Sequence, residues 1–318
     1  MSKFLEIASA YLIKDLEWRN KKLKEIELKY CKLIMVLLCK NEVDIIEKWI
    51  NFHKFMGVDG FIVTDNNSND GTRDILEKYK NKGWILEIID EPEKTYYQRE
   101  WCDRMIKLSK NKYNADWVIS SDADEFWYSN KLNLKKDILS NEGASLLFLP
   151  MINFIPYLNS ENFFSEPSFI GRLLNEFELK KYNIDSPLYS THHVSYKIIL
   201  KASDYKRISF GNHDSAMKNK RVAYISNIRL YHYFIRNFDH FNKKVKKGGE
   251  AISQYSDRGT ATHWRAWYED YYLNNKMKDA WDQFFLFDKF KLLCDIGVIV
   301  KDPCITDFLE HINLANKV

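Results

Sequence analysis

Three acidic side chains lie close together at the end of one apolar segment. The stretch WVISSDADEFWYSN, residues 117–130, places Asp122, Asp124 and Glu125 directly after five apolar or small residues. In an extended segment, residues two apart point the same way, so Asp122 and Asp124 can present their carboxylates to one point. Two such carboxylates repel each other unless a cation lies between them. The spacing therefore predicts a bound divalent cation.

The kind of cation follows from the ligand atoms. Oxygen ligands without cysteine favour Mn²⁺ or Mg²⁺ over zinc. These ions commonly bridge phosphate oxygens, which predicts a nucleoside diphosphate as the other half of the site. The alternative interpretation is a solvated acidic turn that follows a strand. The position of the acids at the end of a predicted strand favours the metal site.

A second polar cluster follows another predicted strand, in FIVTDNNSNDGT, residues 61–72. Asp65 ends the strand, a polar turn follows, and Asp70 can cap the next helix. A turn with a cap explains residues 66–72 without any ligand. The spacing also matches a calcium loop, but a strand precedes it and Arg73 stands where an apolar residue belongs. Asp65 is left as a candidate acceptor of hydrogen bonds from a base or ribose.

The elements that position these acids are alternating strands and helices. Their short connections imply right-handed crossovers, which predicts an α/β fold, Rossmann-like, with a mostly parallel sheet and helices on both faces. Ligands bind at the carboxyl ends of the strands in such sheets, where the acids lie. The predicted strands cover residues 33–39, 60–65, 84–90 and 115–122, and the predicted helices cover residues 42–57, 71–83 and 98–112.

Composition limits the partners. The chain has 318 residues, 45% of them hydrophobic, and a net charge of +4 without a concentrated basic face, which argues against a nucleic-acid partner. Five scattered cysteines indicate a reducing compartment and neither a disulfide framework nor a zinc site. The start does not resemble a signal peptide, and the longest apolar run, residues 33–39, is far shorter than a membrane span. We expect a cytoplasmic protein. Peripheral contact with the inner face of a membrane stays open, through Lys243, Lys244, Lys246 and Lys247.

Several motifs, in this order, resemble those of the glycosyltransferase family 2-like group, which has a GT-A fold. The resemblance rests on residues 37–72, LLCKNEVDIIEKWINFHKFMGVDGFIVTDNNSNDGT, on Gln98, and on residues 116–127, DWVISSDADEFW. The branch concerned carries KNE, DN.S.DGT and D.DEF motifs. A fainter likeness continues through HYFIRNFDHFNKK, residues 232–244, where Asn237 stands in place of the branch's serine.

This resemblance implies the reaction and its partners. The donor would be a nucleotide-sugar, with uridine favoured as the base, and the acceptor would be a hydroxyl of a glycan or another molecule. A divalent metal, usually inversion at the anomeric carbon, and a role in surface polysaccharide or glycan synthesis are also implied. No oligomeric state follows from the sequence.

The family pattern also implies roles for particular residues. Asn41 and Glu42 would lie near the nucleotide, in the loop after the first strand. Asp65 would contact the base, and Asp122 and Asp124 would meet the metal and the diphosphate. The donor-binding set predicted in full is Asn41, Glu42, Asp65, Asn67, Gln98, Arg99 and Asp122.

Enzymes with a GT-A fold often complete the metal site with a histidine from a later strand or loop. His213, in FGNHDS, and His232, in LYHYF, are both available. Taken alone, either is more often a structural histidine than a metal ligand. We favour His213, because a loop flanked by glycine and asparagine can approach a bound ion more readily than a residue inside an apolar strand.

The remaining roles concern charge and proton transfer. Arg99 and Lys197 are candidates to neutralise charge on the departing diphosphate. A carboxylate on the opposite side would take the proton from the acceptor hydroxyl. Asp214 and Glu125 are the candidates for this base. Asp214 is placed slightly ahead, because it lies in the half of the chain where acceptor contacts are expected.

These assignments give a domain organisation. The aromatic side chains of the last part can form core, stack on sugar rings or mediate oligomer contacts. Between the predicted strands that begin at residue 144 and at residue 194, we expect a loop over residues 157–190. The predicted parts are an amphipathic helix (1–30), a GT-A catalytic domain (31–236, with a nucleotide-sugar half 31–130 and an acceptor half 131–236) and an aromatic-rich helical region (237–318).

Two other functions stay open. A nucleotidyltransferase also uses paired carboxylates and a metal, although no glycine-rich phosphate loop is present near the first strand. A non-catalytic module that binds a nucleotide-sugar would keep the fold without turnover.

Overall fold

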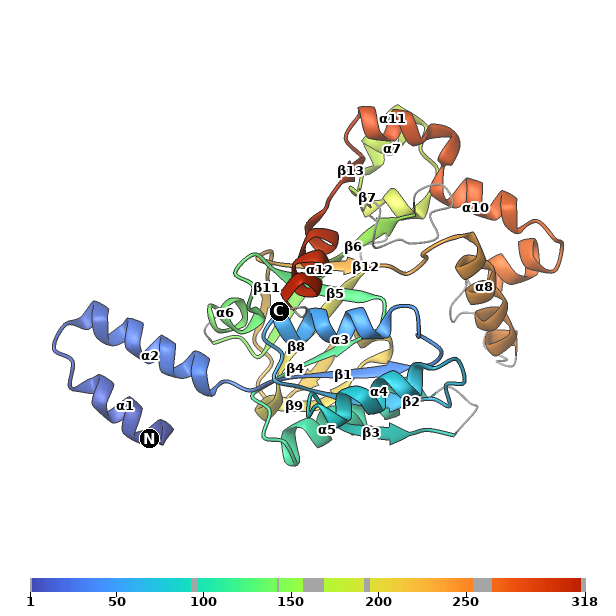
Figure 1. Cartoon of the computed structure of the whole chain (residues 1–318). Coiled ribbons are helices and arrows are strands. Elements are labelled where there is room, and N and C mark those ends of the chain that lie inside the picture. Colours follow the sequence, from blue (N-terminus) through green and yellow to red (C-terminus); the bar gives the residue numbers. More distant parts are fainter. Residues whose placement is uncertain are drawn as a thin grey trace. The chain divides into compact units, whose positions relative to one another are not determined.

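The computed structural model describes residues 2–92, 97–141, 143–156, 169–191, 195–253 and 265–315 (Figure 1). The chain forms two compact units. Unit 1 comprises residues 1–123, 127–149 and 196–229, and unit 2 comprises residues 124–126, 150–195 and 230–318. Each unit therefore combines segments that are far apart in the sequence.

Unit 1 is built on a mostly parallel sheet. Its strands follow the spatial order β8 (Tyr196–Lys201), β4 (Trp117–Ser121), β1 (Leu33–Cys39), β2 (Gly60–Asp65) and β3 (Ile85–Asp90). The last four run parallel, and β8 is antiparallel to β4. In addition, β11 (Val222–Tyr224) pairs in parallel with the start of β6 (Leu146–Ile155). The predicted α/β sheet is confirmed.

Helices cover both faces of this sheet (Figure 1). Phe61 and Ile62 are neighbours in β2, so their side chains point to opposite faces. Phe61 packs against Trp49 of α3, with ring centroids 5.3 Å apart, whereas Ile62 belongs to a buried cluster with Met105 of α5. The helices that follow these strands are α3 (Ile46–Phe55), α4 (Thr72–Asn81), α5 (Gln98–Asn111) and α6 (Leu134–Leu139).

The single helix predicted near the N-terminus is wrong, because the segment forms two helices. These are α1 (Lys3–Tyr11) and α2 (Leu16–Tyr30). The Asp15 carboxylate accepts a hydrogen bond from Trp18 N–H at 2.7 Å and caps α2. The Arg19 guanidinium donates to the Ile13 carbonyl at 2.8 and 2.6 Å, which stabilises the turn between the helices.

Unit 2 combines short strands with helices around an aromatic core. Within it, β6 pairs in parallel with β12 (Ile228–His232) and antiparallel with β7 (Phe169–Gly171), which pairs with β13 (Ile299–Lys301). The helices are α7 (Glu176–Tyr182), α8 (Phe238–Ser253), α10 (Met277–Phe285), α11 (Phe290–Asp295) and α12 (Cys304–Ala315), with a π-helical turn at Trp267–Tyr272.

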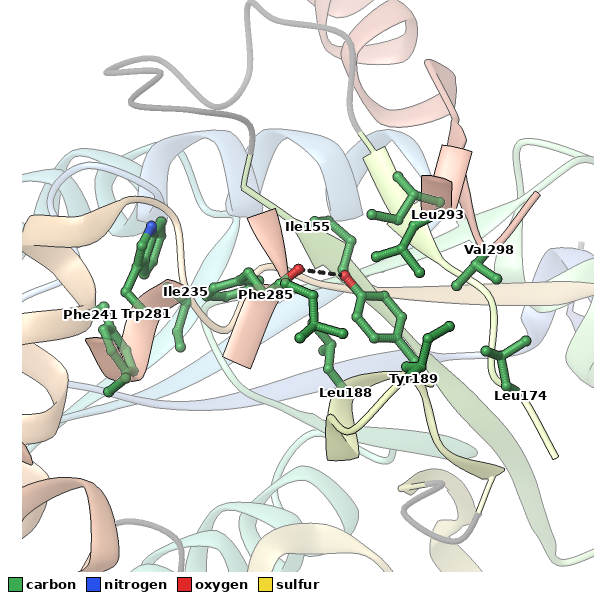
Figure 2. Close-up of a cluster of buried hydrophobic side chains, with 14 of the residues drawn as sticks. Ile155, Leu174, Leu188, Tyr189, Ile235, Phe241, Trp281, Phe285, Leu293 and Val298 are labelled. Carbon is green, nitrogen blue, oxygen red and sulfur yellow. Dashed lines mark hydrogen bonds between the residues drawn. The ribbon is translucent and has the colours of Figure 1, made fainter. Parts of the chain in front are cut away.

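The core of unit 2 lies among these helices (Figure 2). Trp281 and Phe285 of α10 are buried in it, together with Phe241 of α8. The Tyr189 hydroxyl donates a hydrogen bond of 3.1 Å to the Phe285 carbonyl and so satisfies its polar group inside the core. Of the three roles considered for the aromatic region, core is confirmed for Trp281 and Phe285.

The loop predicted over residues 157–190 is wrong for its second part. This part contains β7, α7 and a short 3₁₀ helix, Pro187–Tyr189, whereas residues 157–168 lie outside the described residues. Asn175 and Glu178 form a capping box at the start of α7. The capping box involves only two residues, and a helix of 7 residues is too short to show helical periodicity in the sequence.

Across the ranges that the structure describes, we find no helix that is both long enough and apolar enough to cross a membrane.

Candidate active site

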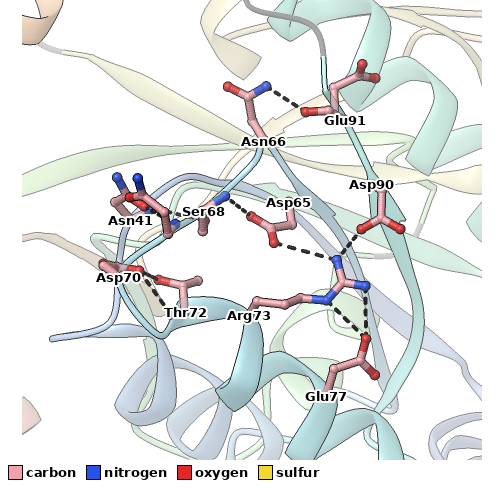
Figure 3. A network of polar contacts seen from close by, with 11 residues as sticks. Asn41, Asp65, Asn66, Ser68, Asp70, Thr72, Arg73, Glu77, Asp90 and Glu91 are labelled. Atoms are coloured by element: carbon pink, nitrogen blue, oxygen red, sulfur yellow. Dashed lines mark hydrogen bonds and ion pairs between the residues drawn. The ribbon is translucent and has the colours of Figure 1, made fainter.

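The loop after β2 is held by hydrogen bonds to the loop after β1 (Figure 3). Asn41 N–H donates to Ser68 Oγ at 3.0 Å, and Asn69 N–H donates to Asn41 Oδ1 at 2.8 Å. Glu42 N–H donates to Thr72 Oγ1 at 2.8 Å. Two of the predicted donor-binding residues, Asn41 and Glu42, thus lie in one polar network with the loop that follows Asp65.

Asp70 fixes the start of α4 within this network. Its carboxylate accepts hydrogen bonds from Thr72 N–H at 3.0 Å and from Val43 N–H at 3.2 Å. Gly71, with φ of 100°, occupies the N-cap position itself. Asn67 also adopts a left-handed backbone, with φ of 59°, a conformation that asparagine tolerates better than most residues. Asp70 thus binds the first N–H of α4 from the position before the N-cap, and not as the N-cap residue that the sequence predicts.

Asp65 ends β2 and is almost fully buried, at 4% exposure. Its carboxylate accepts a hydrogen bond from Ser68 N–H at 3.1 Å and forms an ion pair with Arg73 at 3.6 Å. The same guanidinium pairs with Glu77 at 2.9 Å and with Asp90 at the end of β3 (Figure 3). Arg73 is therefore a shared counter-ion that orients Asp65.

Gln98 and Arg99 begin α5 but differ in their contacts. Gln98 is buried, and its Oε1 accepts a hydrogen bond of 3.2 Å from Gly211 N–H. Arg99 pairs with its neighbour Glu100 at 2.6 Å on the surface. Gln98 thus joins α5 to the loop that carries His213.

Asp122 follows β4 in unit 1 and is paired with a buried lysine. Lys197 of β8 is only 2% exposed, and its ammonium donates to Asp122 Oδ2 at 2.8 Å. The Asp122 side chain keeps 35% of its surface exposed. Lys197, predicted to neutralise phosphate charge, lies directly against the first carboxylate of the acidic motif.

Asp124 belongs to unit 2 and is surrounded by residues of the segment 232–244. The Lys244 ammonium donates to Asp124 Oδ2 at 2.9 Å and to the Phe234 carbonyl at 2.7 Å. His232 Nε2 lies 3.7 Å from Asp124 Oδ1, and His232 Nδ1 lies 3.2 Å from Asn153 Oδ1. Because a side-chain carbonyl oxygen only accepts, Nδ1 is the protonated nitrogen of this histidine.

Charges around Asp124 decide its protonation. Burial raises the pKa of Asp124, but the charge of Lys244, its hydrogen bond and the charge of Arg236 outweigh this effect and hold the pKa far below its ordinary value. Asp124 is therefore a carboxylate at every physiological pH. In the same segment, burial lowers the pKa of His240 to about 2, with Arg236 and Lys244 adding to the effect, so this histidine is neutral.

The two histidines considered as metal ligands lie in different surroundings. His213 is exposed, and its Nδ1 lies 2.7 Å from the Tyr196 carbonyl in unit 1. His232 lies beside Asp124 in unit 2, as described above. The preference for His213 stays a prediction, and the geometry around Asp124 favours His232.

The two candidate bases also differ. Asp214 is half-exposed, and both its oxygens accept hydrogen bonds from Lys220, at 2.7 and 2.8 Å. It lies between β9 (Tyr205–Ile208) and β10 (Ser215–Met217), an antiparallel pair. Glu125 is fully buried at the start of β5 (Glu125–Ser129). The choice between them stays a prediction.

The donor atoms at this motif suit a hard divalent ion. Carboxylate oxygens and one imidazole nitrogen are ligands that Mn²⁺ and Mg²⁺ accept. Ligands bound at about 2.1 Å to one ion lie about 3–4 Å apart, which matches the 3.7 Å between Asp124 Oδ1 and His232 Nε2. The Asn153 side chain contacts His232 Nδ1 and so orients the ring with Nε2 toward Asp124, as the partners of metal-binding histidines commonly do. Within the described ranges, however, no three His, Cys, Asp or Glu side chains are grouped to hold an ion, and each carboxylate already contacts a lysine.

Sequence reasoning missed several residues of this site. Lys244 was assigned to a run of surface lysines, but it is paired with Asp124, while Lys243 and Lys247 are exposed. Lys244 lies three residues after the buried Phe241, one helical turn away, and this spacing was the available signal. Asn153 and Arg73 carried no such signal in the sequence.

The geometry above belongs to a chain that matches a known group of glycosyltransferases. Residues 39–275 match glycosyltransferase family 92 over more than half of the chain. The chain belongs to glycosyltransferase family 92. A family 92 protein of Arabidopsis thaliana, At1g27200, is 25% identical over 109 residues, a match that takes in 34% of this chain but only 18% of that protein.

Solved structures show weaker similarity. Residues 1–349 of TarS from S. aureus give a TM-score of 0.42 and 14% identity, over 82% of this chain and 74% of that one. The mannosyltransferase PcManGT from Pyrobaculum calidifontis, in complex with GDP-Man and Mn²⁺, gives a TM-score of 0.41 and 13% identity, over 76% and 70%. These scores are too low to assign this chain a donor or a metal.

The comparisons confirm that the chain is a glycosyltransferase, and the family they show is family 92. The finer resemblance, to the family 2-like branch, stays a prediction, as do the donor, the acceptor and the pathway.

Proposed function

We propose that this family 92 protein transfers a sugar from a nucleoside-diphosphate sugar to a hydroxyl of a glycan or another acceptor. The observation that carries the proposal is the pair Asp122 and Asp124 directly after a buried parallel strand. Ligands bind at this end of such sheets. Uridine as the base, inversion at the anomeric carbon and a role in surface polysaccharide or glycan synthesis are part of the proposal.

The donor half of the site is assigned to unit 1. Asp65 accepts hydrogen bonds from the base, and its carboxylate is oriented for this by Ser68 and Arg73. The loops of Asn41 and Asn67 carry the nucleoside. Lys197 holds a fixed positive charge beside Asp122, close to the assigned position of the diphosphate. Because these groups are fixed before the donor binds, little ordering is needed on binding.

Asp124 and His232, neighbours in unit 2, would hold Mn²⁺ or Mg²⁺, and the spacing in the sequence adds Asp122 as a candidate ligand. Such an ion supplies a Lewis acid that neutralises charge on a departing diphosphate. Asp214 or Glu125 takes the proton from the acceptor hydroxyl as the new bond to the anomeric carbon forms. Removal of a base of this kind lowers the rate by about 10²- to 10⁴-fold.

We also propose that the protein acts on the cytoplasmic side, in peripheral contact with a membrane. The scattered cysteines and the mixed surface charge support the compartment.

One assay tests the reaction. Purified protein is incubated with Mn²⁺ and a panel of nucleotide sugars, and release of nucleoside diphosphate is followed. Asp124→Asn should abolish the release, whereas Asp288→Asn, at an exposed position, should leave it unchanged. A circular dichroism melt shows that both variants are folded. Unchanged release from a folded Asp124→Asn protein would remove the metal role, and release of pyrophosphate would favour a nucleotidyltransferase.

A further inference from the structure

Lys244 is the residue of α8 that reaches the acidic motif. Its ammonium contacts two oxygens, Asp124 Oδ2 at 2.9 Å and the Phe234 carbonyl at 2.7 Å. The Asp124 side chain is only 12% exposed and the Lys244 side chain 31%, so the carboxylate end of this ion pair is shielded from water. Burial strengthens a charge interaction, because the local dielectric is low. Lys244 is thus a tightly held partner of Asp124.

Two basic side chains act on Asp124. Lys244 and the buried Arg236 both lower the pKa of its carboxyl group. A divalent cation that binds Asp124 Oδ2 has to displace the Lys244 ammonium from it. A nucleoside diphosphate brings phosphate oxygens that can accept the displaced ammonium.

We propose that Lys244 is an internal counter-ion that excludes the divalent metal from Asp124 until the diphosphate of the donor binds. Resting on the proposed function, this inference adds an order of events to it. When the diphosphate arrives, the Lys244 ammonium exchanges Asp124 for a phosphate oxygen. The Phe234 carbonyl retains its hydrogen bond during the exchange, so the ammonium turns without leaving its anchor. Metal and donor therefore bind cooperatively, and either one alone binds weakly.

Measurement of Mn²⁺ affinity tests this directly. Free Mn²⁺ is titrated into the full chain and followed by its EPR signal, with and without UDP or GDP. For the wild type, we expect a nucleotide to tighten Mn²⁺ binding by about 10- to 100-fold, within the usual range of coupling between two sites. Lys244→Met should bind Mn²⁺ alone about tenfold more tightly than the wild type, and nucleotide should add less.

Two further variants keep the test sharp. Lys247→Met removes an exposed lysine of the same helix and should reproduce the wild type. Lys244→Gln removes the charge but keeps a donor for the Phe234 carbonyl, and it serves if the methionine variant does not fold. Suppose that a folded Lys244 variant binds Mn²⁺ alone no more tightly than the wild type and still binds Mn²⁺ together with nucleotide. This result overturns the inference and leaves the proposed function standing. Failure of every protein to bind Mn²⁺ even with nucleotide overturns both.

A separate observation concerns the N-terminal helices of unit 1. The Glu6 carboxylate of α1 accepts hydrogen bonds from the Lys29 ammonium at 2.6 Å and from the Tyr30 hydroxyl at 2.9 Å. Ala10 of α1 and Ile26 of α2 are buried. These contacts fix which face of α1 turns toward α2.

The opposite face of α1 is apolar and exposed. Phe4, Tyr11 and Leu12 recur at helical spacing and are 77%, 61% and 82% exposed. Trp18, at the start of α2, is 64% exposed. Four large apolar side chains on so short a segment are unusual for a surface that faces only water.

Lysines border this face. Lys14 lies in the turn between the helices, and the Lys21 ammonium lies 5.8 Å from the centre of the Trp18 ring. Aromatic and leucine side chains bordered by lysines are typical of helices that lie in the interface of an anionic membrane. Protein interfaces are also rich in aromatic side chains but poor in lysine, whereas anionic headgroups match both the rings and the lysines.

We infer that the α1–α2 hairpin docks on an anionic lipid surface. Co-sedimentation with phosphatidylcholine vesicles, with and without phosphatidylglycerol, tests it. We expect binding to the anionic vesicles to be at least tenfold stronger, to weaken with salt, and to be lost in a Phe4→Glu/Leu12→Glu variant. Phe177→Glu, at an exposed aromatic position of α7, is the control. The inference is overturned if the wild type does not bind the vesicles. It is also overturned if the wild type dimerises and only the Phe4→Glu/Leu12→Glu variant abolishes the dimer, because the hairpin would then bind a second copy of the chain.

Discussion

At the scale of single residues, the acidic side chains of this site are each matched by a specific cation. Asp65 is paired with Arg73, Asp122 with Lys197 and Asp124 with Lys244. Asp65 ends β2, and Asp122 and Asp124 follow β4. A buried carboxylate is stable only with such a partner. Removal of one partner would leave a charge without compensation in the folded state, and the pairs also orient the carboxylates before any ligand binds.

Arg73→Met tests this at Asp65. The substitution leaves Asp65, Glu77 and Asp90 without their common cation. We expect a loss of about 1–3 kcal/mol in the free energy of unfolding, between the values for an exposed and a buried ion pair, because Arg73 is itself 34% exposed. If Asp65 contacts the base, UDP affinity should fall about tenfold as well. Denaturant melts and calorimetry measure the two effects. Arg172→Met, which breaks a surface pair with Glu178, is the matched control and should change neither quantity appreciably.

The acids of the candidate site could be predicted from the sequence, but their cations could not. Residue type and spacing can be read along the chain, so the sequence alone predicts Asp122 and Asp124 as site residues. Lys197 and Lys244 lie 75 and 120 residues away from their partners, and only the tertiary fold brings each pair together. The four lysines of residues 243–247 are alike in the sequence, yet helical geometry turns Lys244 inward and leaves the other three exposed.

At the scale of elements, long apolar strands were predictable and short capped helices were not. β1 and β2 are buried along their length, so a continuous apolar run identifies them. The break between α1 and α2 depends on Asp15, and the start of α7 depends on Asn175 and Glu178. Such signals involve one or two residues, which periodicity over a longer window averages out.

A buried histidine joins α3 to β5 and makes the free energy of unfolding depend on pH. His53 of α3 is fully buried, with Nε2 accepting from Trp127 N–H at 3.1 Å and Nδ1 donating to the Trp49 carbonyl at 2.9 Å. Burial lowers the pKa of His53 to about 3, despite the opposing effect of the Trp49 hydrogen bond. Below its ordinary pKa of 6.5, the unfolded chain takes up a proton that the folded chain does not. The contribution of His53 to the free energy of unfolding is therefore fully present above pH 6.5 and is lost as the pH decreases toward 3.

We expect this histidine to cost about 2 kcal/mol of stability between pH 6.5 and pH 5. Urea unfolding at a series of pH values measures the slope. His53→Gln is neutral throughout the range and should flatten the slope by one proton, whatever its stability at pH 7. His311→Gln, at an exposed position of α12, should leave the slope as in the wild type. Identical slopes for wild type and His53→Gln would contradict the assignment.

At the scale of the whole molecule, opposite charges are paired locally in the fold. Basic and acidic residues are nearly equal in number, 48 and 44, and the ion pairs described above join residues far apart in sequence. A ligand that inserts into these pairs changes the energy of the folded state alone, because the pairs do not exist in the unfolded chain. Ligand binding should therefore be visible as a change in global stability.

Thermal melts with ligand and chelator test this for the metal. A ligand present at 100 times its Kd stabilises the folded state by about 2.7 kcal/mol, which raises the Tm by several degrees. We expect Mn²⁺ with UDP to raise the Tm in this way and EDTA to abolish the rise. Mn²⁺ alone should change the Tm little, because it must displace Lys244 from Asp124. In Asp124→Asn the combined rise should disappear, whereas Asp288→Asn should retain it. A full rise with Mn²⁺ alone would show that metal binding does not wait for the nucleotide.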